Sequence, residues 1–266
     1  MARKRKDTKL PAPFLRSLYV KSEGLADKSG YPFNLPFFNV DFELEFEEPV
    51  TILVGENGTG KSTLIEAIAA LAGYDEAGGG KGYRPVDHQM ALDKSGSDLG
   101  DVLRARWLPK MTDGWFFRAE TFFSVARFQD EMAQRYPEFG GPPPDYLSQS
   151  HGEGFVQFFE DRLSRQGIYF MDEPESALSP NRQLELLYVL KNIQNGAVSQ
   201  VIMATHSPIL MATPGARILE ITHRGMAPVD LEDTAHFKLY QSFVRDPEGF
   251  IADAVAERDA QEIAGN

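Results

Sequence analysis

The sequence lacks several features that would place it in a class at once. It has no cysteine, which excludes disulfide bonds, thiol catalysis and cysteine-bound zinc. No apolar run approaches the roughly 18 residues that a membrane-spanning helix needs. The basic start, residues 1–6, is followed by charges and prolines where a signal peptide would be apolar. Net positive charge is also missing, because the formal charge is −12 at pH 7. A broadly basic nucleic-acid cradle is therefore not expected, and we predict a soluble, cytoplasmic protein.

The composition is that of an ordered globular protein. The chain has 266 residues, of which 42% are hydrophobic and 25% are charged, which suits one large α/β domain or two small ones. Five of the first nine residues are Arg or Lys, a pattern typical of a solvated, flexible tail. We interpret residues 1–266 as a single domain that carries this basic tail at residues 1–9.

Two kinds of strand pattern are present. Residues 38–47 alternate apolar and polar side chains, and residues 14–21 form a weaker candidate strand that could pair with them. Such alternation is typical of an antiparallel sheet with one wet face. Residues 51–54, 168–171 and 201–204 are instead apolar throughout, which predicts a parallel sheet covered on both faces.

Helices are expected next to these apolar strands. Residues 61–71 carry apolar side chains at helical spacing, and a second helix has Ser179 as its N-cap, Pro180 as its first residue and Gly196 as its stop. The fold class is therefore α/β, with a mostly parallel core sheet and an N-terminal antiparallel β-subdomain.

A long insertion separates the two halves of this sheet. We expect a main lobe formed by residues 10–74 and 167–266, and an inserted helical lobe at about residues 75–166. Within the insertion, residues 98–108 and 122–134 favour helices.

The strongest chemical signal is a phosphate-binding loop at residues 55–63, GENGTGKST, between an apolar strand and a helix. Glycines let backbone N–H groups surround phosphate oxygens, and the helix N-terminus adds its positive dipole end. Lys61 is expected to reach the β- and γ-phosphates, and the Ser62 hydroxyl to bind Mg²⁺. The alternative is a glycine-rich turn with an exposed lysine. The candidate nucleotide-binding residues are Asn57, Gly58, Thr59, Gly60, Lys61, Ser62 and Thr63.

Polar residues follow two of the later apolar strands. Asp172 and Glu173 end the strand at residues 168–171, and His206 follows the strand at residues 201–204. The ends of parallel strands meet at one edge of a sheet, so these side chains should converge on the phosphate-binding loop. We expect Asp172 to bind Mg²⁺, Glu173 to orient or deprotonate the attacking water, and His206 to contact the γ-phosphate. A purely structural His206 is the alternative.

Together, these motifs resemble the ABC-type ATPase superfamily of P-loop NTPases. Residues 172–179, DEPESALS, look like its Walker B motif and D-loop, with His206 as its switch histidine. The resemblance implies catalysis by Glu173, His206 and Lys61, with ATP and Mg²⁺ bound. Glu120 is the positional candidate for the family's metal-contacting glutamine, although it is a glutamate here. An aromatic side chain often stacks on adenine in this superfamily, and three candidates remain open: Tyr31, Phe33 and Phe37.

The superfamily's signature motif has a degenerate counterpart at residues 147–153, LSQSHGE. The resemblance implies that Ser150, Gly152 and Glu153 act in trans on ATP held by a partner, in a head-to-tail homodimer. Apolar spacing after Gly152 predicts a helix whose free N-terminus could bind an anion, and an ordinary capped helix is the alternative.

The whole-chain pattern is similar to a compact group of bacterial ATPases related to the RecF and SMC heads. This resemblance favours a nucleotide-gated motor or switch in DNA repair or genome defence, acting with an effector protein or DNA. The alternatives are the cytoplasmic ATP-binding subunit of a membrane transporter and a non-hydrolysing, ATP-dependent interaction module. The intact Asp172, Glu173 and His206 argue against the last of these.

Overall fold

A seven-stranded sheet forms the centre of the computed structural model, which describes residues 10–21, 29–76, 78–80, 95–111, 113–118, 158–160, 162–163 and 165–264. The strands are, in spatial order, β10 (Gly225–Pro228), β9 (Arg217–Thr222), β3 (Val50–Val54), β8 (Gln200–Ala204), β7 (Ile168–Asp172), β6 (Gly114–Arg118) and β4 (Gly79–Gly80). The five inner strands are parallel, and the two edge strands are antiparallel to their neighbours. The mostly parallel α/β fold expected from the sequence is confirmed.

Consecutive side chains of the inner strands enter two different cores. In β7, Phe170 faces the core beneath the sheet and Met171 the core above it, and Ile202 and Met203 divide in the same way in β8. Every residue of β3, β7 and β8 is buried. This double coverage explains why these strands are apolar without alternation.

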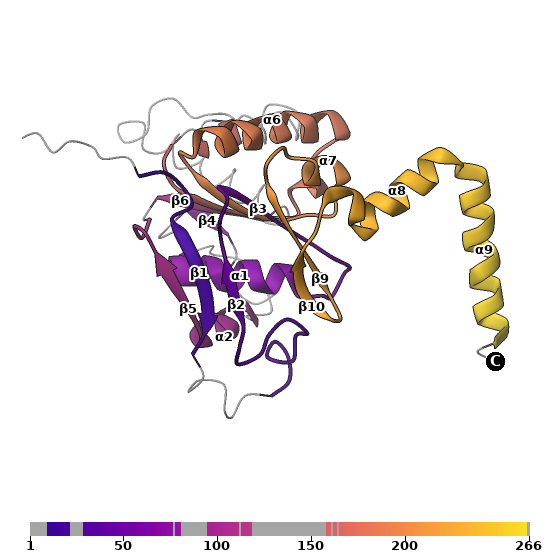
Figure 1. Cartoon of the computed structure of the whole chain (residues 1–266), viewed down its shortest axis with the longest axis horizontal. Coiled ribbons are helices and arrows are strands. Elements are labelled where there is room, and N and C mark those ends of the chain that lie inside the picture. The colour runs from indigo at the N-terminus through magenta and orange to yellow at the C-terminus, as the bar shows by residue number, and fades with distance from the viewer. Residues whose placement is uncertain are drawn as a thin grey trace, which may run out of the picture.

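Helices cover both faces of the sheet (Figure 1). The helix α1 (Lys61–Ala72) packs Leu64, Ile65 and Ile68 into one core, and α6 (Pro180–Gly196) packs Leu186 and Leu190 into the other. The short helix α7 (Pro208–Met211) adds Leu210 and Met211 to the second core. The helix α6 ends at Gly196, as expected, and Ala197 takes its left-handed cap with φ 47°.

A second, three-stranded antiparallel sheet has the order β2 (Glu43–Glu45), β1 (Leu15–Val20) and β5 (Leu103–Trp107). The expected N-terminal β-subdomain is therefore present. The strand predicted over residues 38–47 is shortened to three residues, although Phe42, Leu44 and Phe46 still point into the core. Their period-2 pattern fixed the buried face correctly but overstated the length of backbone pairing.

The segment expected as an inserted lobe contributes instead to both sheets. The helix α2 (Ser95–Val102) ends where β5 begins, so the helix predicted over residues 98–108 is wrong in its second half. Leu103 is buried whereas Arg104 and Arg106 are exposed, an alternation that suits the strand. Because β6 pairs with β7, residues 114–118 belong to the main sheet and not to an inserted lobe. The helix expected at residues 122–134 and the basic tail lie outside the described residues.

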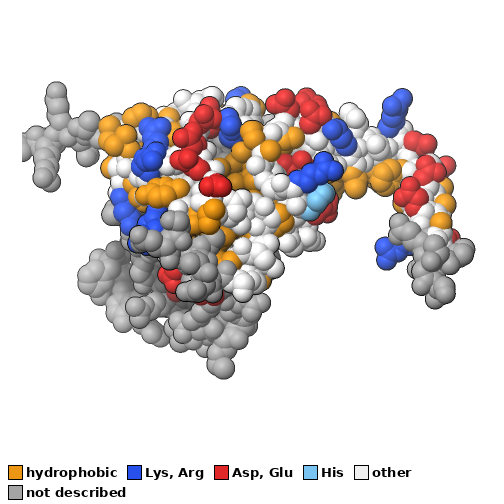
Figure 2. Space-filling view, turned by 60° about the horizontal axis from the view of Figure 1, so that its bottom comes forward, with side chains coloured by type: hydrophobic (Ala, Val, Ile, Leu, Met, Phe, Trp, Pro, Cys, Tyr) orange, Lys and Arg blue, Asp and Glu red, His pale blue; other side chains and the backbone are white. Residues whose placement is uncertain are grey.

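Two helices leave the body at its C-terminal end, after η3 (Leu231–Asp233). They are α8 (Ala235–Arg245) and α9 (Pro247–Ala264), which we call the helical arm. The arm projects away from both sheets (Figure 1). Its apolar and acidic side chains are visible on the surface (Figure 2). Large apolar residues are exposed along it: Leu239, Tyr240, Phe243, Val244, Ile251 and Val255. Within the described residues, no helix is both long enough and apolar enough to cross a membrane.

Candidate nucleotide-binding site

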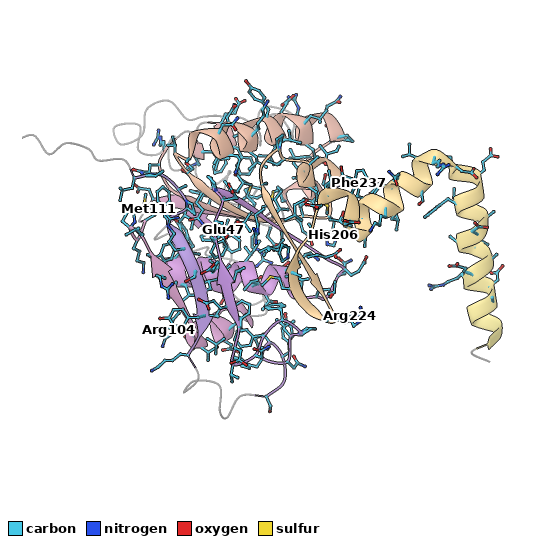
Figure 3. The ribbon with its side chains drawn as sticks, in the orientation of Figure 1. Glu47, Arg104, Met111, His206, Arg224 and Phe237 are labelled. Carbon is cyan, nitrogen blue, oxygen red and sulfur yellow. The ribbon has the colours of Figure 1, made fainter. Side chains whose placement is uncertain are left out.

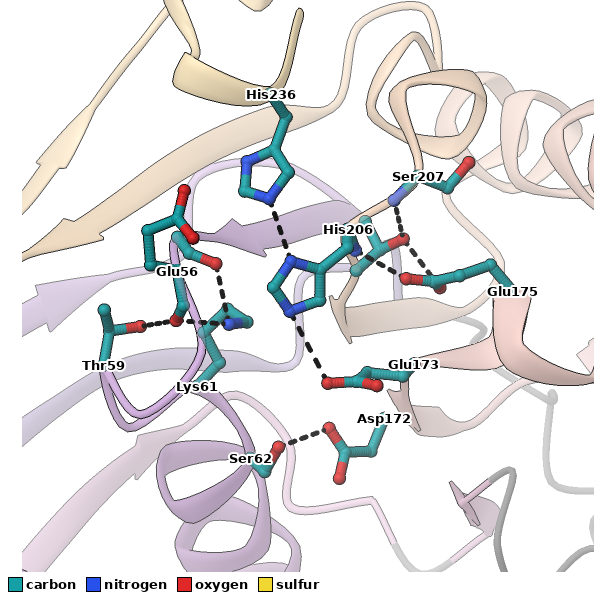
Figure 4. A network of polar contacts seen from close by, with 12 residues as sticks. Glu56, Thr59, Lys61, Ser62, Asp172, Glu173, Glu175, His206, Ser207 and His236 are labelled. Atoms are coloured by element: carbon teal, nitrogen blue, oxygen red, sulfur yellow. Dashed lines mark hydrogen bonds and ion pairs between the residues drawn. The ribbon is translucent and has the colours of Figure 1, made fainter. Parts of the chain in front are cut away.

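The glycine-rich loop connects β3 to α1 at the carboxyl edge of the main sheet (Figure 4). Two of its glycines are sterically required. Gly55 has φ 147°, and a Cβ there would lie 2.3 Å from the carbonyl oxygen of Ile221; Gly60 has φ 95°, and its Cβ would lie 2.7 Å from Leu35 Cδ2. The loop therefore delivers the open N-terminus of α1, with its positive dipole end, to this edge.

Lys61 is the first residue of α1, and its side chain folds back over the loop. The Nζ atom donates hydrogen bonds to the carbonyl oxygens of Gly55 at 2.8 Å and Glu56 at 2.9 Å. Burial lowers the pKa of Lys61, while the carboxylates of Glu173 and Asp172 oppose that shift. The loop thus holds a cation beside the free N–H groups of a helix, which is an environment suited to phosphate.

Ser62 and Asp172 meet although 110 residues separate them in the sequence. The Ser62 hydroxyl donates a 2.9 Å hydrogen bond to Asp172 Oδ1. Asp172 ends β7 and is buried. The phosphate-binding loop and the acidic strand end therefore form one site, as the topology of a parallel sheet predicts.

These two side chains fit a magnesium ion. A serine hydroxyl and a carboxylate supply hard oxygen ligands, and Mg²⁺ commonly takes one or two such ligands, with substrate phosphates and water completing its coordination. Within the described part of the chain, no cluster of three or more His, Cys, Asp or Glu residues is arranged to hold a metal ion by itself.

Arg118 connects the second oxygen of Asp172 to another buried acid. Its guanidinium lies 2.7 Å from Glu66 Oε1 and 3.7 Å from Asp172 Oδ2, and it donates a 3.1 Å hydrogen bond to the Glu76 carbonyl. Burial raises the pKa of Glu66 to about 7, although Arg118 opposes the shift. Sequence reasoning gave Arg118 no role. The sequence shows only an arginine at the end of an apolar run; its register with Asp172 is set by the sheet.

Glu173 and His206 face each other at the ends of β7 and β8. Glu173 adopts a left-handed conformation, with φ 47°, and its side chain is 41% exposed. His206 Nε2 lies 3.6 Å from Glu173 Oε1. Burial, followed by the Lys61 charge, lowers the pKa of His206, so the neutral imidazole is favoured. A solvent-accessible carboxylate can accept a proton from a water molecule, and a neutral histidine beside it can donate a hydrogen bond to a phosphate oxygen.

Glu175 ties the two strand ends together. Its carboxylate accepts a 2.8 Å hydrogen bond from the Thr205 hydroxyl and a 2.5 Å bond from the His206 backbone N–H. Burial raises the pKa of Glu175, although these bonds favour its charged form. In the sequence, Glu175 stands out only as one position of the 172–179 motif. Its two partners, Thr205 and His206, lie about 30 residues further along the chain, and no spacing rule links them.

The opposite side of the His206 ring contacts the helical arm. His206 lies beside the start of α8 (Figure 3). Its Nδ1 lies 2.9 Å from Nε2 of His236, the second residue of that helix (Figure 4). Nothing in the sequence spacing signalled this pair.

The three candidate aromatic residues differ in exposure. Phe33 and Phe37 pack against or within the core, whereas Tyr31 is 58% exposed and its hydroxyl shares a hydrogen bond with Thr63 Oγ1. Tyr31 is therefore the exposed candidate, anchored to the first turn of α1. The other expected site residues, Glu120, Ser150, Gly152 and Glu153, lie outside the described residues.

The strand–loop–helix unit and the acidic end of β7, two strands away in the same parallel sheet, define a P-loop nucleoside triphosphatase. Sequence comparisons agree. Residues 34–103 match a family model described as an AAA domain, and residues 154–212 match one described as an AAA domain of a putative AbiEii toxin, type IV toxin–antitoxin system.

Curated relatives align over most of the chain. The thiamine import ATP-binding protein ThiQ of Vibrio vulnificus is 25% identical over 198 residues, covering 66% of this chain and 77% of ThiQ. The cytochrome c biogenesis ATP-binding export protein CcmA of Rhizobium etli is 25% identical over 224 residues, covering 80% and 98%. Among solved structures, the SMC head domain of Thermotoga maritima matches with a TM-score of 0.44 and 17% identity, covering 82% of this chain and all of that one.

The chain is similar in sequence to ATPases of the ABC-type P-loop superfamily. With its phosphate-binding loop and acidic strand end joined in one site, it is an ATP-hydrolysing enzyme.

Proposed function

We propose that this protein is a Mg²⁺-dependent ATPase whose nucleotide site is built from Lys61, Ser62, Asp172, Glu173 and His206. The 2.9 Å contact between Ser62 Oγ and Asp172 Oδ1 carries the proposal, because it joins the phosphate-binding loop to the acidic strand end. The ion would be held by these two side chains and would supply positive charge to the phosphate oxygens.

The chain's own groups then have distinct roles. Lys61 and the loop amides, including those of Asn57, Gly58, Thr59 and Gly60, would bind the triphosphate and offset charge developing on the γ-phosphoryl group. Glu173 would orient the attacking water and accept its proton, since its side chain is exposed to solvent at the strand end. His206 would donate a hydrogen bond to the γ-phosphate.

Tyr31 would stack on the base, because its ring is exposed and its hydroxyl is anchored to Thr63.

We further propose that ATP drives head-to-tail homodimerisation of a single-domain protein. Ser150, Gly152 and Glu153 would reach the nucleotide of the partner subunit, and Glu120 would approach the metal. The resemblance of residues 147–153 to the signature motif supports this arrangement. Hydrolysis would remove the γ-phosphate that bridges the two copies, so the dimer would open.

Glu173→Gln tests the catalytic assignment. We expect a loss of turnover of about 100-fold or more, since general-base catalysis contributes about 10²–10⁴-fold, while ATP binding persists and sedimentation shows a trapped dimer. Glu185→Gln, which changes a carboxylate on α6, is the matched control. Wild-type turnover by Glu173→Gln would remove Glu173 from the role of base.

Ser150→Arg tests the paired arrangement separately. A bulky cation at the interface should prevent ATP-driven association while each monomer still binds nucleotide. Persistent dimers in this variant would show that Ser150 does not act on the partner's nucleotide. That result would not affect the proposed nucleotide site within each subunit.

For the biological process, we propose a switch in genome defence or DNA repair that acts in the cytoplasm. The family description over residues 154–212, a putative toxin of a type IV toxin–antitoxin system, favours defence. ATPase activity stimulated by DNA, with a steep salt dependence, would support direct DNA binding.

The alternative is the ATP-binding subunit of a membrane transporter, which the names of ThiQ and CcmA favour. Co-purification with a membrane protein would support that alternative.

A further inference from the structure

The two nitrogens of the His206 ring have different surroundings. Nδ1 is bonded to His236 at 2.9 Å, whereas Nε2 is buried, has no hydrogen-bond partner among the described residues and lies 3.6 Å from Glu173 Oε1. The two imidazole rings are tilted by 57° with centroids 5.0 Å apart. The unbonded nitrogen of His206 is thus on the side of the catalytic carboxylate (Figure 4).

The position of His236 is fixed by the start of α8. Thr234 is fully buried and caps the helix by accepting a 3.2 Å hydrogen bond from the Phe237 N–H. The Thr234 hydroxyl also donates to the Leu231 carbonyl at 2.8 Å, and Glu220 accepts a bond from the Ala235 N–H at 3.3 Å. A capped first turn with these tethers holds the His236 ring against His206.

The contact restricts which nitrogens carry protons. A neutral imidazole has one N–H donor and one acceptor nitrogen, so one histidine of the pair must donate and the other accept. If His206 donates from Nε2 to a phosphate, its Nδ1 is the acceptor and His236 Nε2 is the donor. In the opposite arrangement, the lone pair of His206 Nε2 would face the phosphate oxygens and repel them.

The surroundings of His236 favour the first arrangement. Its Nδ1 is buried and has no hydrogen-bond partner among the described residues. A proton on that nitrogen would therefore lack an acceptor, whereas a proton on Nε2 has one in His206.

We propose that His236 is a positioning residue for ATP hydrolysis: its Nε2–H donates to Nδ1 of His206 and holds His206 in the tautomer that donates from Nε2 to the γ-phosphate. The inference rests on the proposed function, because it assumes that His206 contacts the γ-phosphate. It also makes the first turn of α8 part of the nucleotide site, although no residue of α8 is buried.

Steady-state kinetics with MgATP test the proposal in the full chain. His236→Leu removes the donor, and we expect kcat to fall about 10-fold, which is the effect of one hydrogen bond, with less than a twofold change in KM. His236→Gln can donate from a similarly placed Nε2 and should restore most of the loss.

His206→Ala should reduce kcat further, and adding His236→Leu to it should change little, since the two residues act together. His223→Gln, an exposed histidine, is the control and should match wild type.

The outcomes separate this inference from the proposed function. Unchanged turnover in His206→Ala would contradict the proposed role of His206 itself. Impaired His206→Ala with wild-type His236→Leu would overturn only the positioning role. Equal losses in His236→Leu and His236→Gln, with additive effects in the double variant, would indicate a merely structural residue and also overturn it.

A spectroscopic measurement avoids dependence on variant folding. In wild-type protein with ¹⁵N-labelled histidine, the ring nitrogens report the tautomer directly. We expect the His206 proton on Nε2, and in His236→Leu a mixture of both tautomers. A His206 proton on Nδ1 in the wild-type protein would overturn the proposal regardless of the kinetics.

Discussion

The nucleotide edge of the main sheet and the helical arm are stabilised in different ways. At the edge, β3, β7 and β8 are buried along their whole lengths, and charged groups such as Lys61, Glu66 and Asp172 are buried within hydrogen-bonded networks. Along the arm, α8 contains no buried residue and large apolar side chains face solvent. The comparison teaches that side-chain type alone does not define a core, since both regions are rich in aromatic and aliphatic residues.

Truncating one phenylalanine in each region should give the largest difference in the free energy of unfolding. Phe170→Ala removes a fully buried ring that packs edge-on against Tyr74 and Phe116, and it should lower the free energy of unfolding by about 3–5 kcal/mol. Phe243→Ala removes a ring that is 38% exposed and contacts Phe250, so we expect a loss of about 1 kcal/mol or less. Urea titration measures both, and equal losses would break the comparison.

The buried carboxylate of Glu66 should make the stability of the body depend on pH. Its pKa is raised by burial from 4.5 to about 7, so the folded state keeps the proton while the unfolded state loses it. The stability from this proton is fully present below pH 4.5 and is lost as the pH rises to 7, by about 3 kcal/mol.

Glu66→Gln should remove that fall and keep a hydrogen bond to Arg118. Urea titrations at several pH values between 4 and 8 provide the measurement. Parallel pH profiles for the variant and wild type would show that Glu66 is not the group responsible.

A lysine from each region sharpens the contrast in function. Lys61→Ala should weaken ATP binding about 10- to 100-fold, because charge-assisted hydrogen bonds contribute about 1.5–3 kcal/mol. Lys238→Ala removes an exposed lysine of α8 that pairs with Asp233 and should leave ATP affinity unchanged. Isothermal titration calorimetry distinguishes them, and unchanged affinity in Lys61→Ala would contradict the phosphate assignment.

The smallest effect is expected from shortening the arm. Deleting residues 247–266 removes α9 but leaves Thr234 and His236 in place, so the melting temperature of the body should shift by no more than about 2 °C. A drop of 10 °C or more, measured by circular dichroism, would show that the arm supports the core after all.

Much of the fold could be predicted from local patterns. The strands at β3, β7 and β8 followed from continuous apolar runs, and α1 and α6 from helical spacing with recognisable caps. The errors occurred where a short pattern is ambiguous: Leu103–Trp107 alternates like a strand but follows a helix directly. The pairing of this segment with β1, which lies more than 80 residues earlier, decides in favour of the strand over a continued helix.

The contacts of the nucleotide site also include some that the sequence predicts and some that it does not. The convergence of Ser62 with Asp172 could be expected, because parallel strand ends meet at one edge of the sheet. The contacts of Arg118 with Glu66 and of Glu175 with His206 had no sequence signal. Such partners have no fixed spacing, since they are set by how helices and loops pack over the strands.

The sequence by itself determined the phosphate-binding loop, the acidic strand end and the parallel sheet that brings them together, because each depends on a local pattern of glycine, charge or hydrophobicity. Only the tertiary structure decided that Asp172 shares an arginine with Glu66, that Glu175 bridges two strand ends, and that the first turn of α8 reaches His206. These contacts join side chains distant in the chain, and their free energy depends on burial and geometry that no local pattern contains.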